Sequence, residues 1–396
     1  MRTILNDKSA MPNKHIYLDF QATTPVDPEV LKEMMPYFTE RFANPASTGQ
    51  FGYEINLVVE NCRSVIAQKI NCLKDEIIFT SGATESINIA IKGLFENLNQ
   101  GEIVTLKSEH SAVLNTCRYL EMKGIAVNYL DIDANGLVDL NKLSDCITEK
   151  TTLVAIMHVN NEIGVIQPID DIGKICATKN VPFLVDAAQS FGKLKIDVKK
   201  SNISILAISG HKIYAPKGIG ALYLKKNINS DITPLFHGGG QENGFRSGTL
   251  NVTGIVGLAK ATEIAMEKML SEQKRILFLR NFFFESIKEK IADIIVNGDL
   301  QQRVAGNLNL SFKNVSGEVL LNRLDNINIV VSRGSACNST KNQGSHVLKA
   351  IGLSDELADS SIRISIGRFT TEKDIIEAAE KISLIVKDIR KISTIS

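Results

Sequence analysis

The feature that most constrains this chain is a regular alternation of short apolar segments with longer helical ones, from Tyr17 to about Ala265. Short apolar runs are typical of strands buried on both faces of a sheet. Such strands, joined by helices, build an α/β domain with a mostly parallel sheet. Polar residues follow these runs at their carboxyl ends: Thr84, His110, Asn161, Asp186 and Lys212. Because such sheets bind ligands at that edge, these positions together predict one site.

A second, smaller unit follows the alternating part. After a helix over about 261–290, the sequence predicts strands at 294–296, 307–311 and 329–332, a helix at 317–324 and a terminal helix. Apolar residues recur along one face of that last helix, at Ile375, Ala379, Ile382, Val386 and Ile389. We expect a large α/β domain over residues 15–264 and a smaller α+β domain over 265–396, with 1–14 as an extension.

The first helix is predicted after Asp27-Pro28, with Asp27 as its N-cap and Pro28 as its first residue. Its apolar face is predicted to consist of Val30, Leu31, Met34, Met35 and Phe38.

Composition limits the class of protein. The chain has 396 residues, 44% hydrophobic and 22% charged, as expected for a soluble globular protein with a sizeable core. The formal net charge of +1 gives no sign of a nucleic-acid partner. No apolar run approaches the roughly 20 residues of a membrane span, and residues 1–14 lack a signal-peptide pattern. The six cysteines form no Cys-x-x-Cys pair, and no histidine cluster has metal-ligand spacing. We expect a cytoplasmic protein with no metal site and no membrane partner.

Lys212 follows an apolar run that ends at Ile208. A lysine at the end of a buried strand lies in poor solvent, which lowers the pKa of its amine and favours Schiff-base chemistry. Most lysines in loops are exposed and do no chemistry. Here Ser209 and His211 place a hydroxyl and an imidazole beside the lysine, and a Gly/Pro-rich turn follows. We therefore interpret Lys212 as a reactive lysine.

The segment Ser81-Gly82-Ala83-Thr84 joins a predicted strand to a helix. Backbone N–H groups and the positive end of the helix dipole meet at such a junction, which is a natural seat for a phosphate. Thr84 adds a hydroxyl donor. Many strand–helix turns bind nothing, so this pattern alone is weak.

Two further residues stand at strand ends. Asp186 terminates a buried strand, where its carboxylate needs a partner. His110 lies at a strand-to-helix turn, where a solvated or helix-capping histidine is the common alternative to a functional one.

Cys337 lies in the small, polar, glycine-punctuated segment from Ser332 to Ser345, a composition that predicts a loop. Arg333 and Lys341 lie near it in the sequence and favour a thiolate, the nucleophilic form of cysteine. From composition alone, an incidental surface thiol remains the alternative.

Together these motifs resemble the cysteine desulfurases of the NifS-like group, which are class V, pyridoxal-phosphate (PLP) dependent enzymes. The resemblance covers nearly the whole chain. It rests on the Ser-Gly-His-Lys motif at Lys212, the Gly-Ser-Ala-Cys loop at Cys337, Tyr17-Leu18-Asp19, and the segments 80–86, 160–164, 186–189, 246–249 and 361–365. It implies fold type I of the PLP-dependent transferases, with a mostly parallel central sheet in the large domain.

The resemblance also implies residue roles. Lys212 would hold PLP through a Schiff base, His110 would lie over the ring and carry protons, and Asp186 would keep the ring nitrogen protonated. Gln189 would contact the ring oxygen O3′. The other implied cofactor residues are Ala83, Thr84, Asn161, Ser209, His211 and Thr249, the last reaching the phosphate of the other subunit of a homodimer.

The implied substrate residues are Asn161 and Arg363, whose guanidinium would clamp the substrate carboxylate. Cys337 would accept the sulfur. Its long loop is similar to the subgroup whose cysteine arm needs no activator. We therefore expect conversion of L-cysteine to L-alanine, with a persulfide on Cys337 for an acceptor protein, such as an iron–sulfur scaffold or a tRNA-thiolating enzyme. The alternatives are a selenocysteine lyase or an aminotransferase of the same fold, or a scaffold without activity.

The sequence departs from the family pattern in places. Gly49 and Leu184 stand where the family often has His, Ser204 where it has Asp, and Ala215 where it has Gly. None of these replaces a residue assigned to chemistry. The sequence ends at Ser396, soon after the terminal helix, whereas housekeeping iron–sulfur members carry a further tail that contacts the scaffold protein, so that partner is in doubt.

Overall fold

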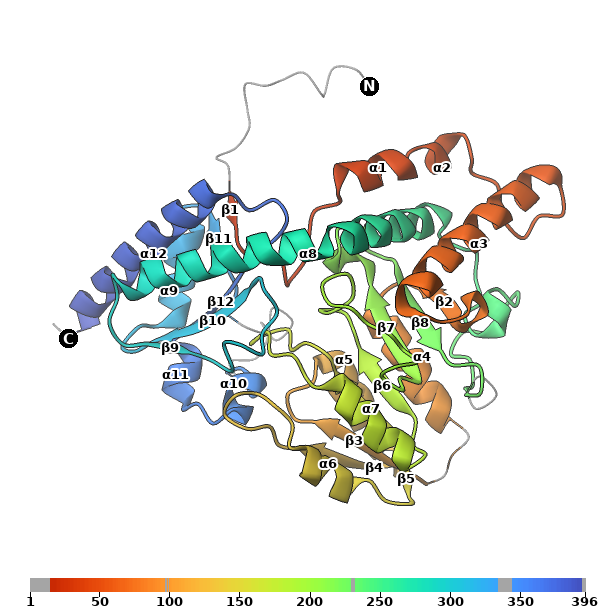
Figure 1. The fold of residues 1–396 in the computed structure, drawn as a ribbon, viewed down its shortest axis with the longest axis horizontal. Coiled ribbons are helices and arrows are strands. Elements are labelled where there is room, and N and C mark those ends of the chain that lie inside the picture. The colour runs from red at the N-terminus through yellow and green to blue at the C-terminus, as the bar shows by residue number, and fades with distance from the viewer. Residues whose placement is uncertain (1–14, 97, 99, 229–231, 334–343, 394–396) are drawn as a thin grey trace.

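A seven-stranded sheet forms the centre of the larger part of the chain (Figure 1). The computed structural model describes residues 15–96, 98, 100–228, 232–333 and 344–393. The strands, in spatial order, are β2 (Ile77–Thr80), β8 (Gly220–Leu224), β7 (Ile205–Ser209), β6 (Phe183–Asp186), β5 (Thr151–Met157), β3 (Glu102–Leu106) and β4 (Ala126–Leu130). Only β8 runs antiparallel to its neighbours. The predicted mostly parallel α/β sheet is therefore confirmed.

Helices cover both faces of this sheet, and the strands are buried accordingly. Along β3, Val104 and Leu106 belong to one core and Ile103 to the other, because successive side chains point to opposite faces. The first core contains side chains of α1 (Pro28–Met34), α3 (Gln50–Ile70), α6 (Leu140–Cys146), α7 (Ile169–Thr178) and α8 (Val252–Lys288). The second contains those of α4 (Ala83–Phe95) and α5 (Ser111–Glu121).

A separate core lies in the smaller part of the chain. There β12 (Ser361–Ser365), β10 (Asn307–Phe312) and β9 (Ile294–Val296) form an antiparallel sheet, and β1 (Ile16–Tyr17) pairs in parallel with β11 (Ile329–Val330). The helices here are α9 (Gly317–Asp325), α10 (His346–Ala350), α11 (Asp355–Asp359) and α12 (Glu372–Ser393). The predicted apolar stripe of the terminal helix is confirmed, since Ile375, Ala379, Ile382, Val386 and Ile389 are all buried.

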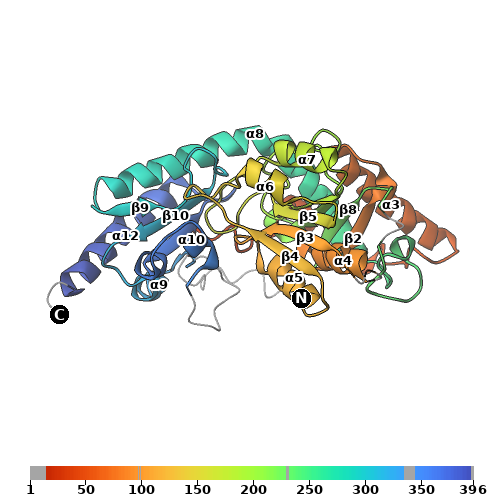
Figure 2. The ribbon, with the colours of Figure 1, turned by 90° about the horizontal axis from the view of Figure 1, so that it is seen from below.

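One long helix, α8, connects the two parts. Figure 2 shows it along one side of the molecule, above both sheets. Its first half packs in the core of the large sheet, and Leu279, Phe283 and Ile287 pack in the smaller core. The expected boundary between residues 264 and 265 falls inside this helix, so the division into domains stays a prediction. No helix of the described ranges is long and apolar enough to cross a bilayer.

The N-terminal helix is partly as predicted. Asp27 is its N-cap, because the Asp27 carboxylate accepts the Glu29 N–H at 2.9 Å, and Pro28 is its first residue. The predicted apolar face is wrong for Leu31, Met35 and Phe38, which are 48%, 56% and 55% exposed. The helix ends at Met34, and the short helix α2 (Pro36–Thr39) begins at a proline, which has no N–H to continue the hydrogen bonds of α1.

Candidate active site

A cavity of about 500 Å³ lies at the carboxyl edge of the large sheet. The turns after β2, β3, β5, β6 and β7 all reach it, because these strands run in the same direction. Nearly all predicted site residues line it: Ala83, Thr84, His110, Asn161, Asp186, Gln189, Ser209, His211, Lys212 and Arg363. Sequence reasoning missed other lining residues, among them Gln21, Thr23, Glu162, Lys217 and His346.

Two predicted site residues do not meet this cavity. Thr249 is exposed and does not line it. Cys337 lies outside the described residues.

Lys212 is held at the floor of the cavity by backbone oxygens. A 3₁₀ turn, Gly210–Lys212, follows β7 directly, and the Lys212 ammonium donates to the carbonyls of Gln21 at 2.5 Å and Ala22 at 2.7 Å. The same segment is fixed to the N-terminal strand region, since Thr24 N–H donates to the His211 carbonyl. The amine is therefore oriented by neutral acceptors, without a carboxylate in these contacts.

Asp186 ends β6 and is buried at the cavity wall. One carboxylate oxygen accepts the Ala188 N–H at 2.9 Å. Burial raises the pKa of Asp186, an effect that His110, the Ala188 N–H and Lys212 oppose. A carboxylate in this setting is best stabilised by a cationic N–H donor that enters the cavity.

His110 both caps a helix and lines the cavity. It is the N-cap of α5, and its Nδ1 accepts the Ala112 N–H at 3.1 Å. Nδ1 is thus an acceptor, and the neutral ring carries its proton on Nε2. Burial lowers the pKa of His110, Asp186 opposes this, and Lys212 and His346 lower it further. The capping alternative and the cavity position are therefore both realised.

The turn between β2 and α4 is shaped as a seat for an anion. Gly82 has φ 153°, which favours glycine, and it lies against Gly220 of β8, where a Cβ would come within 2.5 Å of the Gly82 Cα. The first turn of α4 begins at Ala83, so its free N–H groups and Thr84 lie at the cavity.

Two further cavity residues, Ser209 and His211, lie at the end of β7 and just after it. Ser209 is buried, and His211 Nδ1 lies 3.1 Å from the Thr23 hydroxyl. Burial and the nearby Lys212, Lys217 and Lys193 lower the pKa of His211 to about 4, so its ring is neutral at pH 7. The neutral ring serves as a hydrogen-bonding group.

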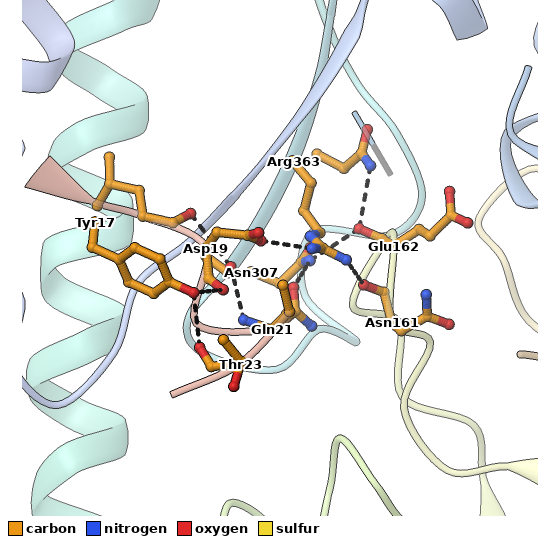
Figure 3. A network of polar contacts seen from close by, with 12 residues as sticks. Tyr17, Asp19, Gln21, Thr23, Asn161, Glu162, Asn307 and Arg363 are labelled. Atoms are coloured by element: carbon orange, nitrogen blue, oxygen red, sulfur yellow. Dashed lines mark hydrogen bonds and ion pairs between the residues drawn. The ribbon is translucent and has the colours of Figure 1, made fainter. Parts of the chain in front are cut away.

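Arg363 comes from β12 of the smaller sheet and lines the cavity. Figure 3 shows its contacts with Asp19 and Asn161. Its Nη2 pairs with Asp19 at 2.6 Å, and its Nη1 donates to the Asn161 carbonyl at 2.7 Å. Tyr17 steadies the Asp19 region, because its hydroxyl donates to the carbonyls of Asp19 and Thr23, both at 3.0 Å. The guanidinium is thus already oriented, and its buried Nε–H has no partner within the described structure.

These residues fit PLP as a group. The cavity offers an amine for the aldehyde at Lys212, a buried carboxylate for the ring nitrogen at Asp186, and a helix N-terminus with Ser209 and His211 for the phosphate. Arg363 offers a fork-shaped cation for a carboxylate. The arrangement is suited to reactions at the α-carbon of an amino acid.

Comparison with known proteins agrees with this chemistry. Residues 16–377 match the family described as aminotransferase class-V. "Cysteine desulfurase IscS" of Rickettsia prowazekii (strain Madrid E) is 50% identical over 381 residues, which is 96% of this chain and 92% of that protein.

Two solved structures are also similar. A "NifS-like protein" superposes with a TM-score of 0.88 at 38% identity, covering 94% of this chain and all of that one. The structure titled "SspA in complex with cysteine" has a TM-score of 0.79 at 39% identity, covering 90% of this chain and 99% of that one.

Proposed function

This chain belongs to the aminotransferase class-V family, and from that premise we propose that it is a PLP-dependent cysteine desulfurase, which converts L-cysteine to L-alanine. The observation that carries the proposal is the meeting of Lys212, Asp186, His110 and Arg363 around one cavity. The relatives named cysteine desulfurase, and the related structure that holds cysteine, favour this activity over an aminotransferase or a selenocysteine lyase.

Seven residues of the cavity have a proposed part in holding the cofactor. Lys212 would bond to the aldehyde carbon, Asp186 would pair with the ring nitrogen, and Gln189 would donate to the ring oxygen. The phosphate is received by Ala83, Thr84, Ser209 and His211. When bound, PLP withdraws electrons from the α-carbon of the amino acid.

The substrate is oriented and its protons are moved by groups of this chain. Arg363 and Asn161 hold the carboxylate of cysteine. The amine of Lys212 takes the Cα proton and returns it later. His110 donates its proton from Nε2. To take up the proton of the substrate thiol, the ring needs a free nitrogen lone pair. Because Nε2 carries the proton and the lone pair of Nδ1 accepts the Ala112 N–H, Nδ1 must first release that amide.

Sulfur leaves the substrate by transfer to Cys337. The Cys337 thiolate attacks the substrate sulfur, an S–S bond forms, the Cβ–S bond breaks, and its electron pair is protonated to give alanine. The product on the protein is a persulfide, which passes to an acceptor protein.

We further propose that the active form is a homodimer with sites shared between subunits. The exposed apolar side chains Leu31, Met35, Phe38, Phe42, Phe51, Tyr53 and Leu57 gather on α1–α3 and the intervening loop. A group of this size is typical of a protein–protein contact. The segment 238–249 does not supply its own cavity with Thr249, which supports a role for Thr249 in the partner's site.

A cytoplasmic location is also proposed. Cys62, Cys72, Cys117, Cys146 and Cys176 are all free thiols, as expected for a reducing compartment.

The decisive experiment measures alanine formed from L-cysteine by the purified protein. Cys337→Ser is expected to abolish alanine formation while the visible absorbance of bound PLP remains. Cys146→Ser, a half-buried thiol on α6, is the matched control and should leave the rate unchanged. Unchanged alanine formation in Cys337→Ser would refute sulfur transfer to this cysteine and favour the alternative reactions.

A further inference from the structure

Lys193 is a charged residue near the site to which the reaction assigns no part. Its side chain is half-buried, and its Nζ donates to the Gln189 Oε1 at 3.3 Å. Gly192, with φ 73°, turns the chain back toward the site; a Cβ there would come within 2.8 Å of Ile213. The Lys193 carbonyl accepts from Gln273, which fixes the backbone. The position of this lysine is therefore well defined by the fold.

The charges around Lys193 are mostly of its own sign. Burial lowers the pKa of Lys193 to about 7, and the positive charges of Lys212 and Arg363 act in the same direction. The nearby carboxylates are engaged elsewhere: Glu272 pairs with Arg368, and Asp19 with Arg363. In the part of the chain that the structure describes, no carboxylate forms an ion pair with Lys193.

A chain of hydrogen bonds joins Lys193 to the reactive lysine. Lys193 donates to Gln189 Oε1, Gln189 Nε2 donates to the Gln21 carbonyl at 2.9 Å, and Lys212 Nζ donates to that same carbonyl at 2.5 Å. Lys193 itself does not line the active-site cavity; it borders a small separate cavity of about 60 Å³ on the other side of Gln21 and Lys212.

We propose that Lys193 is a positioning residue: its donation to Gln189 fixes which end of the Gln189 amide faces the active-site cavity, so that an N–H, and not the carbonyl, meets the ring oxygen of the cofactor. This inference rests on the proposed binding of PLP in the cavity.

The reason lies in the donors and acceptors of an amide. Gln189 has one oxygen and an NH₂ group with two N–H donors. Lys193, which has donors only, binds the oxygen. One N–H is used on the Gln21 carbonyl, and the second is left for an acceptor in the cavity. Without Lys193 the amide gains freedom to rotate, and its oxygen would then repel an anionic ring oxygen.

The charge of Lys193 has a second effect, which also bears on how easily the Lys212–cofactor bond is protonated. In its protonated form, Lys193 disfavours a further positive charge at Lys212, as a neighbouring cation does for other Schiff-base lysines. Removing Lys193 therefore removes both the oriented Gln189 donor and a positive charge. Each of these losses makes the Lys212–cofactor bond easier to protonate.

The test compares Lys193→Met, which keeps the length of the stem, with Lys193→Arg, which keeps charge and donors. Lys195→Met is the matched control, because Lys195 is exposed two residues away. Three quantities are measured on the full-length protein: the pH midpoint of the visible PLP band, the dissociation constant of PLP, and the thermal melting curve.

For Lys193→Met we expect the midpoint to rise by about half to one pH unit and PLP to dissociate roughly three- to tenfold more readily, as for the loss of one hydrogen bond. Lys193→Arg should recover most of both, and Lys195→Met should match the wild type. In a Gln189→Leu background, Lys193→Met should have little further effect on PLP affinity, because the interaction it removes is already absent.

Folded Lys193→Met with wild-type midpoint and affinity would overturn the inference. Should Lys193→Met fail to fold, Lys193→Gln, which keeps a polar end, is measured by the same criteria. A wild-type protein that binds no PLP at all would instead overturn the proposed function. The two failures are thus distinguishable.

Discussion

Arg63 and Glu242 form a two-pronged ion pair between segments 179 residues apart, with Nη2–Oε1 at 2.7 Å and Nη1–Oε2 at 2.8 Å. Glu242 Oε2 also accepts the Phe79 N–H at 2.6 Å, and Arg63 Nη1 donates to the Ile77 carbonyl. Both side chains are buried. The pair fastens the segment 238–249 to β2, the strand that leads into the proposed phosphate seat.

A second ion pair joins segment 238–249 to the first turn of α4. Arg246 Nε lies 2.8 Å from Glu85 Oε1, and the other oxygen of Glu85 accepts the Ser81 N–H at 2.7 Å. Glu242 and Asn243 also adopt left-handed backbone angles, φ 52° and 54°, which are costly unless surrounding contacts maintain them. The segment that carries Thr249 therefore depends on contacts with the cofactor-binding edge of its own subunit.

The first prediction concerns this pair. Glu242→Ala leaves the Arg63 charge buried without its carboxylate and should lower the free energy of unfolding by about 3 kcal/mol. The measurement is urea denaturation of the PLP-free protein. Asp171→Ala, which breaks the exposed pair with Lys174, is the control and should cost under about 1 kcal/mol. A double variant, Arg63→Met with Glu242→Leu, should recover much of the lost stability. If Glu242→Ala and Asp171→Ala lowered the free energy of unfolding equally, the prediction would be contradicted.

The second prediction concerns Lys212. Lys212→Ala should lose the visible absorbance of the covalently bound cofactor and all turnover of L-cysteine together, because its amine is the one proposed to form the Schiff base. Absorbance spectra and an alanine assay check this. Lys195→Ala removes an exposed lysine and should be indistinguishable from wild type in both. Retained turnover in Lys212→Ala would refute the assignment of Lys212 as the residue that binds PLP through a Schiff base.

The third prediction concerns Asp186. Asp186→Asn keeps a hydrogen-bonding group at the end of β6 but cannot hold the ring nitrogen protonated. The protein should retain most of its PLP while the rate of alanine formation falls by orders of magnitude. PLP content and kcat are measured in parallel, with Asp131→Asn, an exposed position, as the control. A rate close to wild type would mean that another carboxylate serves the ring.

The sequence predicted the large sheet and the site edge well, because both follow from local patterns. Apolar strands alternating with helices specify a parallel sheet, and polar residues at strand ends then meet without any long-range information. Thr84, His110, Asn161, Asp186 and Lys212 all line the cavity for this reason.

Other parts of the site depend on partners far away in the chain. Asp19 pairs with Arg363 across 344 residues, and Glu242 with Arg63 across 179. Neither pair has a periodicity or spacing that would reveal it. The role proposed for Lys193 could not be predicted from the sequence either, because it depends on Gly192 turning the chain so that Lys193 reaches Gln189. The exposure of Leu31, Met35 and Phe38 contradicted the helical pattern, since amphipathic spacing does not tell which apolar face is covered within one subunit.

The fourth prediction concerns pH and His158. Burial lowers the pKa of this histidine from 6.5 to about 4 in the folded protein, and Asp170 only partly opposes it. Between these two values the unfolded chain binds a proton that the folded protein does not, so stability falls as the pH decreases through the window. The loss from His158 amounts to about 3 kcal/mol by pH 4.

Replacing His158 removes this dependence. In His158→Leu, the slope of the unfolding free energy against pH should be smaller by up to about 1.4 kcal/mol per pH unit between pH 4 and 6.5. Urea denaturation at several pH values gives the slope. His15→Gln, at an exposed histidine, is the control. An unchanged slope in His158→Leu would show that His158 binds its proton equally well in the folded and unfolded states, and would contradict the prediction.

The last prediction concerns Thr249 and the shared site. If Thr249 serves the partner's phosphate, each site takes Lys212 from one subunit and Thr249 from the other. In a dimer of one Lys212→Ala chain with one Thr249→Ala chain, one site then carries both lesions and the other carries neither. PLP binding should also depend on protein concentration, because association completes the phosphate seat.

The two chains are co-expressed with different affinity tags, and mixed dimers are isolated by both. Provided that Thr249→Ala alone is substantially impaired, the mixed dimer should regain about the activity of one wild-type site, well above either parent. Lys195→Ala paired with Thr249→Ala is the control for one intact chain. Isolated mixed dimers without recovered activity would place Thr249 in its own subunit's site, because sites that draw both residues from one chain would each keep a lesion.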